Sequence, residues 1–259
     1  MPLLTHLSSA VDDTGWLDAP PLRPTAASFA LHLLGVPEFS HCGSPVPVAR
    51  AQTRALLFRL GTSVQPTPRS ELAALFWPET DDATARQNLR RLLSLARSEL
   101  PDPDALAATS EAVSLNPRLV WSDARVIEGL QHVDSLDAWQ TTADLYRGSF
   151  LSGFFLRNNA EFELWQTATA ERLRTRGLNA LSRLIDHSTA RGDYEQAVQY
   201  ARRYLEIDSV AETIHRHLIT LYARLGERDL ALRQFGECTL ILERELGVEP
   251  LPETRAACN

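Results

Sequence analysis

Residues 82–100 read DATARQNLRRLLSLARSEL, and the rest of the chain is interpreted around this stretch. At about 100° per residue its apolar side chains share one stripe, which predicts a single amphipathic helix. The members of the stripe are Leu89, Leu92, Leu93, Ala96 and Leu100. A separate arc carries Arg86, Gln87, Arg90, Arg91, Ser94, Arg97 and Ser98. This arc contains no carboxylate, whereas ordinary solvated helices alternate charge to gain i,i+4 pairs.

The composition of this arc admits more than one interpretation. Arg and Gln are side chains that bond bidentately to guanine and adenine edges in a major groove, which favours contact with DNA. A basic solvent-exposed face and a protein-docking helix explain the same pattern. The elements that flank this helix therefore have to distinguish between these three interpretations.

A short helix is predicted before this stretch, over residues 71–77. Ser70 is its expected N-cap and Pro78 ends it, while Leu72, Leu75 and Phe76 form its buried face. Trp77, at its end, is interpreted as a core residue. Asp81 and Asp82 stand where acidic side chains cap a following helix and favour its positive end.

Elements on either side extend this pattern. Residues 28–34, 36–39 and 46–48 are expected to form a small antiparallel sheet, and residues 50–60 a helix with Leu56, Leu57 and Leu60 buried. After the long helix, residues 106–109 and 112–115 alternate like a hairpin with Ser110 and Glu111 at its tip. This order is typical of a winged helix-turn-helix, in which the second helix of the motif enters the major groove.

The last hundred residues contain a repeat. The segments GDYEQA (192–197) and GERDLA (226–231) lie 34 positions apart, which is the tetratricopeptide period. We expect helix pairs of 178–190 with 194–206 and of 211–225 with 228–245, preceded by helical segments at 122–149 and 159–176. The expected packing positions are Tyr200, Ala201, Tyr204, Phe235 and Cys238.

These segments resemble a known family. The run SELAALFWPETDDATARQNLRRLLSLARSEL (70–100), with RAQTRALLFRL (50–60) before it, resembles the OmpR-type winged helix of SARP-type bacterial transcriptional regulators. The segments YRGSFLSGF (146–154) and ELGVEPLPETRA (245–256) resemble the bacterial transcriptional activation domain. Together the resemblances cover nearly everything after residue 28. Since family members often carry further domains, the chain is either a minimal regulator or a fragment of a longer one.

The resemblance implies a mainly α protein with three parts. Residues 1–27 are expected to be a flexible leader, 28–120 an α+β winged helix-turn-helix domain, and 121–259 an all-α, tetratricopeptide-like activation domain. The resemblance also implies binding to direct promoter repeats of double-stranded DNA. A polymerase-contact loop would comprise Trp77, Pro78, Glu79, Thr80 and Asp81, and the helical domain would supply homodimerisation, ligand response or contact with the transcription machinery.

Composition excludes several other classes of protein. All 26 basic residues are Arg, so a Walker motif and a Schiff-base lysine are absent. Cys42, Cys238 and Cys258 are few and widely separated, which fits a reducing bacterial cytoplasm. His215 and His217, two apart on a helix, make a poor metal pair. We expect no enzyme activity, no cofactor, no metal and no membrane span.

Charge distribution limits how DNA could be bound. Residues 29–120 carry nine Arg and nine acidic residues, and residues 121–259 carry sixteen Arg and twenty-one acidic residues. The winged region is therefore not the basic domain of a typical DNA binder, and local Arg placement has to supply the attraction.

The leading hypothesis is a sequence-specific activator. Its predicted groove-facing residues are Arg86, Gln87, Arg90, Arg91, Ser94 and Arg97, with Arg50, Arg54 and Ser110 on the DNA backbone. One alternative is a tetratricopeptide interaction scaffold whose winged domain does not bind DNA. A second is a sensor whose helical bundle holds a small molecule.

Overall fold

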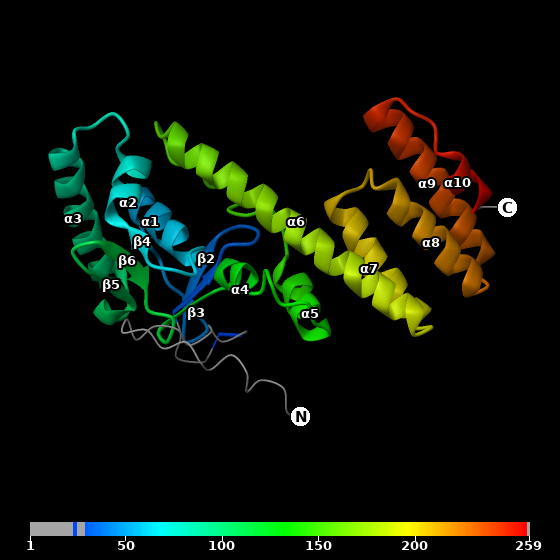
Figure 1. Ribbon diagram of the computed structural model, residues 1–259, viewed down its shortest axis with the longest axis horizontal. Helices are drawn as coiled ribbons and strands as arrows, with labels where there is room; N and C mark the ends of the chain where they lie inside the picture. The colour runs from blue at the N-terminus through cyan, green and yellow to red at the C-terminus, as the bar shows by residue number, and fades with distance from the viewer. Residues whose placement is uncertain (1–22, 25–28, 258–259) are drawn as a thin grey trace. The chain divides into compact units, whose positions relative to one another are not determined.

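The computed structural model describes residues 23–24 and 29–257, and almost all of the predicted leader, 1–27, lies outside these residues. The chain divides into two compact units (Figure 1). The first contains the described residues up to His132 together with Leu145–Leu173, and the second contains Val133–Asp144 together with the residues from Arg174 onward. This division does not follow the expected boundary at residue 120, which stays a prediction.

A four-stranded sheet opens the first unit, in the order β3-β2-β1-β7. The strands are β1 (Phe29–His32), β2 (Glu38–His41), β3 (Ser44–Pro45) and β7 (Val120–Ser122). The predicted strand at 46–48 is wrong, because a tight turn at Cys42 and Gly43 brings Ser44 and Pro45 into the ladder instead. The parallel pairing of β1 with β7 was not predicted, since it joins segments about ninety residues apart.

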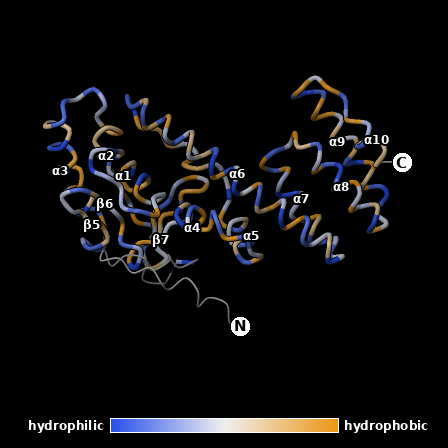
Figure 2. Tube along the Cα trace, in the orientation of Figure 1, coloured by the Kyte–Doolittle hydropathy of each residue, from blue (hydrophilic) through white to orange (hydrophobic). Residues whose placement is uncertain are grey.

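Three helices lie between β3 and β7 in the chain, and their apolar stripes contribute to the core of the first unit. They are α1 (Ala51–Gly61), α2 (Arg69–Phe76) and α3 (Asp82–Glu99). The predicted buried stripe of α3 is confirmed, because all five of its members are at most 7% exposed. Figure 2 shows the corresponding mixture of hydrophobic and hydrophilic residues along each helix.

The predicted start of α2 is wrong. Pro68 occupies the N-cap position and makes no side-chain cap, so Ser70 lies inside the helix. The reason is a tertiary contact, because the N–H of Arg69 donates to the carbonyl of Glu111 at 2.8 Å. The neighbouring strand β4 (Thr67–Pro68) therefore leads directly into the helix.

The predicted hairpin is confirmed as β5 (Leu106–Ala108) and β6 (Ala112–Leu115), which are antiparallel and place Ala108 opposite Val113. A short 3-10 turn, η1 (Pro103–Ala105), precedes it. Strand β4 adds a third strand on the other edge of β6. The resulting sheet, β4-β6-β5, is the wing of a winged helix.

The helical segments after β7 differ from the prediction in continuity. Residues 122–149 are not one helix but α4 (Asp123–Gly129) and α5 (Leu136–Leu145), and α6 (Ala160–Ala190) is a single helix where two were expected. Gly177 lies within α6 and does not interrupt it. A helix tolerates an internal Gly at a cost of about 1 kcal/mol relative to Ala, so a lone Gly without Pro is a weak boundary signal.

The second unit contains the predicted repeat. Its helices are α5, the part of α6 from Arg174 onward, α7 (Tyr194–Ile207), α8 (Glu212–Arg224), α9 (Arg228–Leu246) and the short α10 (Pro252–Ala256). Gly192 and Gly226 both adopt positive φ, at 76° and 77°, at the predicted intra-repeat turns. Ala197 and Ala231 are buried where paired helices meet, as the repeat predicts.

None of the helices in the described ranges combines the length and apolarity that crossing a membrane requires.

Candidate nucleic-acid interface

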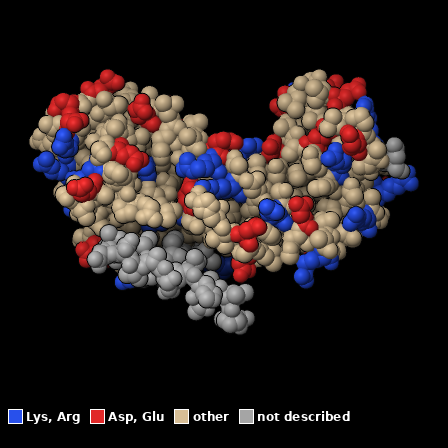
Figure 3. All heavy atoms as spheres, in the orientation of Figure 1, with Lys and Arg blue, Asp and Glu red and all other residues tan. Residues whose placement is uncertain are grey.

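The predicted groove-facing side chains lie together on the solvent side of α3. Arg86, Gln87, Arg90, Arg91, Ser94 and Arg97 are all exposed, while the opposite stripe is buried against the core. Figure 3 shows Arg side chains at the left of the view, in the region of α3, with acidic side chains above and below them. The helix therefore presents one basic face to solvent although the winged region as a whole is neutral.

The start of this helix is fixed by Asp81, as predicted. Its Oδ1 accepts the N–H groups of Thr84 at 3.0 Å and Ala83 at 3.1 Å. These bonds favour the ionised carboxylate, and the bonds from Thr84 contribute most to a pKa that lies below the ordinary value. Asp81 thus holds the first turn of α3 in place.

The four guanidinium groups of the arc differ in their protein contacts. Arg86 Nη2 lies 3.3 Å from Asp82 Oδ2, and Arg97 Nε donates to the carbonyl of Leu106 at 3.4 Å. Within the described residues, Arg90 and Arg91 form neither an ion pair nor a hydrogen bond through their side chains. These two side chains keep all of their donors available.

The two predicted backbone contacts on α1 also differ. Arg50 is exposed at the N-cap position and pairs with Glu99 at the end of α3. Arg54 is half-buried, and its guanidinium lies 5.2 Å from the ring centroid of Phe154. This contact favours a packing role for Arg54 over contact with a phosphate.

The tip of the wing reaches the N-terminal end of α2. Ser110 is exposed at this tip. Arg69 Nε donates to the carbonyl of Thr109 at 2.8 Å, which ties the tip to α2. Arg69 was not predicted as a site residue, because its position beside the wing depends on the pairing of β4 with β6.

An open groove of about 870 Å³ joins these parts of the first unit. Its floor contains the small side chains of α2, including Ser70, Ala73 and Ala74. The remaining lining includes Arg69, Arg86, Arg90, Ser110, Glu71, Asp82, Glu111, Glu161 and Trp165. The lining contains both basic and acidic side chains, so the groove is not a simple anion site.

The predicted polymerase-contact loop connects α2 to α3. Trp77 is half-buried, and its ring centroid lies 5.8 Å from that of Phe76, which agrees with a packing role for the indole. The N–H of Thr80 donates to the carbonyl of Trp77 at 3.2 Å, so the loop is compact. Pro78, Glu79 and Asp81 are its exposed residues.

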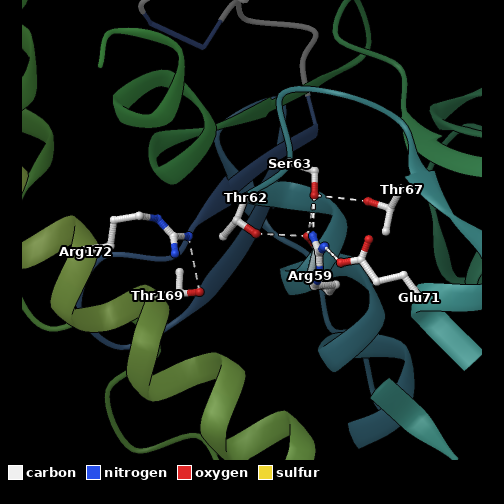
Figure 4. A network of polar contacts seen from close by, with 7 residues as sticks. All are labelled: Arg59, Thr62, Ser63, Thr67, Glu71, Thr169 and Arg172. Atoms are coloured by element: carbon white, nitrogen blue, oxygen red, sulfur yellow. Dashed lines mark hydrogen bonds and ion pairs between the residues drawn. The ribbon is translucent and has the colours of Figure 1, made fainter. Parts of the chain in front are cut away.

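A polar network behind α2 holds α1 in place (Figure 4). Arg59 donates to Ser63 and Glu71, and Ser63 in turn accepts from Thr67 at 3.1 Å. The guanidinium of Arg59 also lies 5.7 Å from the ring centroid of Trp165. Arg59 is therefore a structural residue that links α1, α2 and α6.

Metal-binding groups are not assembled in the described part of the chain. No cluster of three or more His, Cys, Asp or Glu side chains occurs there. His215 is buried, with Nε2 2.8 Å from the carbonyl of Ser209 and Nδ1 2.8 Å from the amide nitrogen of Gln234. These contacts give His215 a structural role, while His217 is exposed.

Comparisons with known proteins bear on both parts of the chain. Residues 121–259, just over half of the chain, match the family model described as the bacterial transcriptional activator domain. A solved structure described as Mycobacterium tuberculosis EmbR in complex with a low-affinity phosphopeptide is similar, with a TM-score of 0.57 and 22% sequence identity. The match covers 89% of this chain and 63% of the EmbR chain, so this chain spans less than two thirds of that relative. No curated protein matches.

Proposed function

The chain belongs to the bacterial transcriptional activator domain family, as its resemblance to SARP-type regulators predicted, and we propose that it activates transcription by binding promoter DNA through α3. The single observation that supports this most is the exposed basic face of α3 beside the wing. A second helix of a helix-turn-helix with this face is the element that enters a major groove. A cytoplasmic location follows from this role.

The protein contacts of the arginines suggest which of them contact base edges and which contact phosphates. Arg90 and Arg91 have unoccupied donors, and with Gln87 and Ser94 they are proposed to read base edges. One bidentate Arg–guanine contact gives about 1–3 kcal/mol of discrimination, so one or two suffice for a promoter preference. Arg86, Arg97, Arg50 and Ser110 are proposed to hold phosphates, which fixes the register of the protein on the duplex.

Other surfaces would complete activation. The loop of Trp77, Pro78, Glu79, Thr80 and Asp81 is proposed to contact RNA polymerase, and its exposed Pro78 and Glu79 support this assignment. The helical domain is proposed to supply homodimerisation, which would match a site made of direct repeats.

Genome-wide selection of DNA fragments bound by the purified protein tests this proposal. We expect enrichment of a repeated motif upstream of coding regions, and loss of that enrichment in an Arg90→Ala, Arg91→Ala double variant. Recovery of the same fragments by both proteins, or of no fragments by either, would show that α3 does not read DNA.

The neutral charge of residues 29–120 favours a second candidate, a protein-interaction scaffold. Its working surface would lie in the second unit, where α7, α8 and α9 line a groove of about 510 Å³ that includes Arg202, Tyr222 and Arg233. The fragment selection separates the two candidates, since a scaffold enriches no sequence.

A further inference from the structure

Asn159 occupies the point where two helices of the first unit meet end to end. It precedes α6, and the C-terminal end of α2 lies beside the start of α6 (Figure 1). The side chain is only 8% exposed. A buried amide in such a place has to find partners for its donors and its acceptor.

The amide nitrogen of Asn159 serves the end of α2. Nδ2 donates to the carbonyl of Leu75 at 3.0 Å and to that of Phe76 at 3.3 Å. The last carbonyls of any helix lack partners within that helix. Here Pro78 ends the helix, and the N–H of Thr80 turns to Trp77 instead. Asn159 therefore supplies donors that the chain after α2 does not.

The amide oxygen of the same side chain serves the start of α6. Oδ1 accepts the N–H of Phe162 at 2.8 Å, which is an N-cap contact. The orientation of the amide is unambiguous, because a flipped amide would point its oxygen at two carbonyls and its nitrogen at a donor. Asp and Ser share the N-cap ability of Asn, but ionised Asp has no donor, and Ser has a single hydroxyl hydrogen on a shorter side chain in place of the two amide hydrogens.

Aromatic packing surrounds this polar contact. Phe162 is fully buried, and its ring centroid lies 6.0 Å from that of Phe76 in α2 and 4.9 Å from that of Trp165. The hydrogen bonds of Asn159 therefore lie beside a packed interface, where an unmade bond costs more than at the surface. Packing brings the two helices together, and Asn159 holds the last carbonyls of α2 beside the start of α6.

We propose that Asn159 is a positioning residue for the DNA-binding motif, which sets the conformation of the α2–α3 loop and thereby the placement of α3. This inference rests on the proposed function. The loop has five residues, Trp77 to Asp81, and Asp81 caps α3 directly. The end of α2 that Asn159 fixes is therefore the origin of a short connection whose other end begins the helix carrying Arg90 and Arg91.

Two variants of Asn159 separate its two contacts. Asn159→Asp and Asn159→Ser keep an acceptor for the N–H of Phe162. The Asp variant removes both donors to α2, and the Ser variant replaces them with one hydroxyl hydrogen on a shorter side chain. A matched control is Arg172→Ala, which removes a 2.9 Å contact between α6 and Glu128 in the same unit without touching α2. Amide hydrogen exchange is measured on each full-length protein without DNA, and affinity for a selected fragment and for a random duplex is then measured across salt.

Loss of the Asn159 donors should loosen the end of α2, so we expect the backbone amides of Trp77 and of residues 79–81 to exchange about tenfold faster in both Asn159 variants. Amides of α1 should keep wild-type exchange rates in both Asn159 variants. The loop amides should keep wild-type exchange rates in the Arg172→Ala control. Affinity for the selected fragment should fall several-fold, with the random duplex and the salt slope unchanged, because no charge on α3 is altered.

Unchanged exchange in the loop of the Asp variant, or equal acceleration throughout the first unit in both variants, would overturn the proposal. An equal loss of affinity for both duplexes would do the same, because it would show general damage and not misplacement of α3. If the wild-type protein binds no DNA, the proposed function fails, while the exchange measurement still decides whether Asn159 sets the loop.

Discussion

The carboxylate of Asp123 accepts the backbone N–H of Leu33, with donor–acceptor distances of 2.8 and 2.9 Å to its two oxygens. It also accepts the N–H of Leu34 at 3.1 Å and that of Ala124 at 2.7 Å. The residue is fully buried, and it joins the start of α4 to the end of β1. Burial raises the pKa of Asp123 to about 6, although the backbone N–H donors act in the opposite direction.

This pKa predicts how the first unit responds to pH. Because the folded-state pKa lies above the unfolded value, the native state binds the extra proton between about pH 4 and pH 6. The contribution of Asp123 to stability therefore falls as pH rises through this window, by up to about 3 kcal/mol. Urea unfolding of wild type and Asp123→Asn at pH 5 and pH 7.5 measures it. The difference between the two pH values should be smaller in the variant, and an equal difference in both proteins would contradict this assignment.

Gly226 and Gly236 form a matched pair in the second unit. Gly226 has a φ of 77° at the turn between α8 and α9, so Gly226→Ala places a side chain in a strained conformation and should lower the unfolding free energy by about 1 kcal/mol. Gly236 lies within α9, where an added Cβ meets nothing within 4 Å. Gly236→Ala should therefore raise stability by about 0.5–1 kcal/mol. Thermal unfolding compares the two, and effects of the same sign would contradict the turn assignment.

The buried, hydrogen-bonded pair of Gln234 in α9 and His215 in α8 predicts a second effect on the stability of the second unit. The carbonyl of Ser209 can only accept, so Nε2 of His215 carries the hydrogen and Nδ1 accepts from the amide of Gln234. Gln234→Met leaves that acceptor buried and unpaired, at a cost of about 1–3 kcal/mol. The adjacent Arg233 is exposed, so Arg233→Met should change the unfolding free energy by less than about 0.5 kcal/mol. Equal losses of unfolding free energy in the Gln234→Met and Arg233→Met variants, measured by denaturant unfolding, would contradict the structural role of His215.

Substitution of Asp82 by Asn is expected to raise the affinity for DNA. Its carboxylate pairs with Arg86 and lies at the edge of the basic face of α3. Asp82→Asn removes a negative charge near the proposed phosphates and frees the guanidinium, so binding at low salt should tighten several-fold. Glu237→Gln, an exposed acid on α9, serves as the control for net charge. Equal tightening by both changes would mean that only the total charge matters.

The sequence predicted those features that arise from local period and turn chemistry. The 3.6-residue period of 82–100 predicted both the buried stripe and the exposed arc of α3. Gly192 and Gly226, placed 34 residues apart, predicted two turns that do require positive φ. Ser110 was correctly placed at the tip of a hairpin, because alternation and turn residues are local signals.

Features that depend on distant partners were not predicted. The pairing of β1 with β7, the entry of β4 into α2 and the position of Arg69 all follow from tertiary contacts. Asn159 looked like an ordinary helix start, since its bonds to α2 cross more than eighty residues of sequence. The separate helices predicted for 159–176 and 178–190 are wrong, because α6 runs through both ranges without a break.

The most direct test of the proposed function is fluorescence anisotropy of a duplex from the region upstream of the protein's own gene, titrated between about 50 and 200 mM salt. We predict salt-dependent binding that Arg90→Ala and Arg97→Ala each weaken. Only Arg97→Ala, which removes a proposed phosphate contact, should also reduce the log–log salt slope, by about one. Arg233→Ala, which removes an exposed arginine from α9, should leave both affinity and slope unchanged. Undetectable binding at the lowest salt, or wild-type binding by the two α3 variants, would contradict the assignment of α3 as the DNA-reading helix.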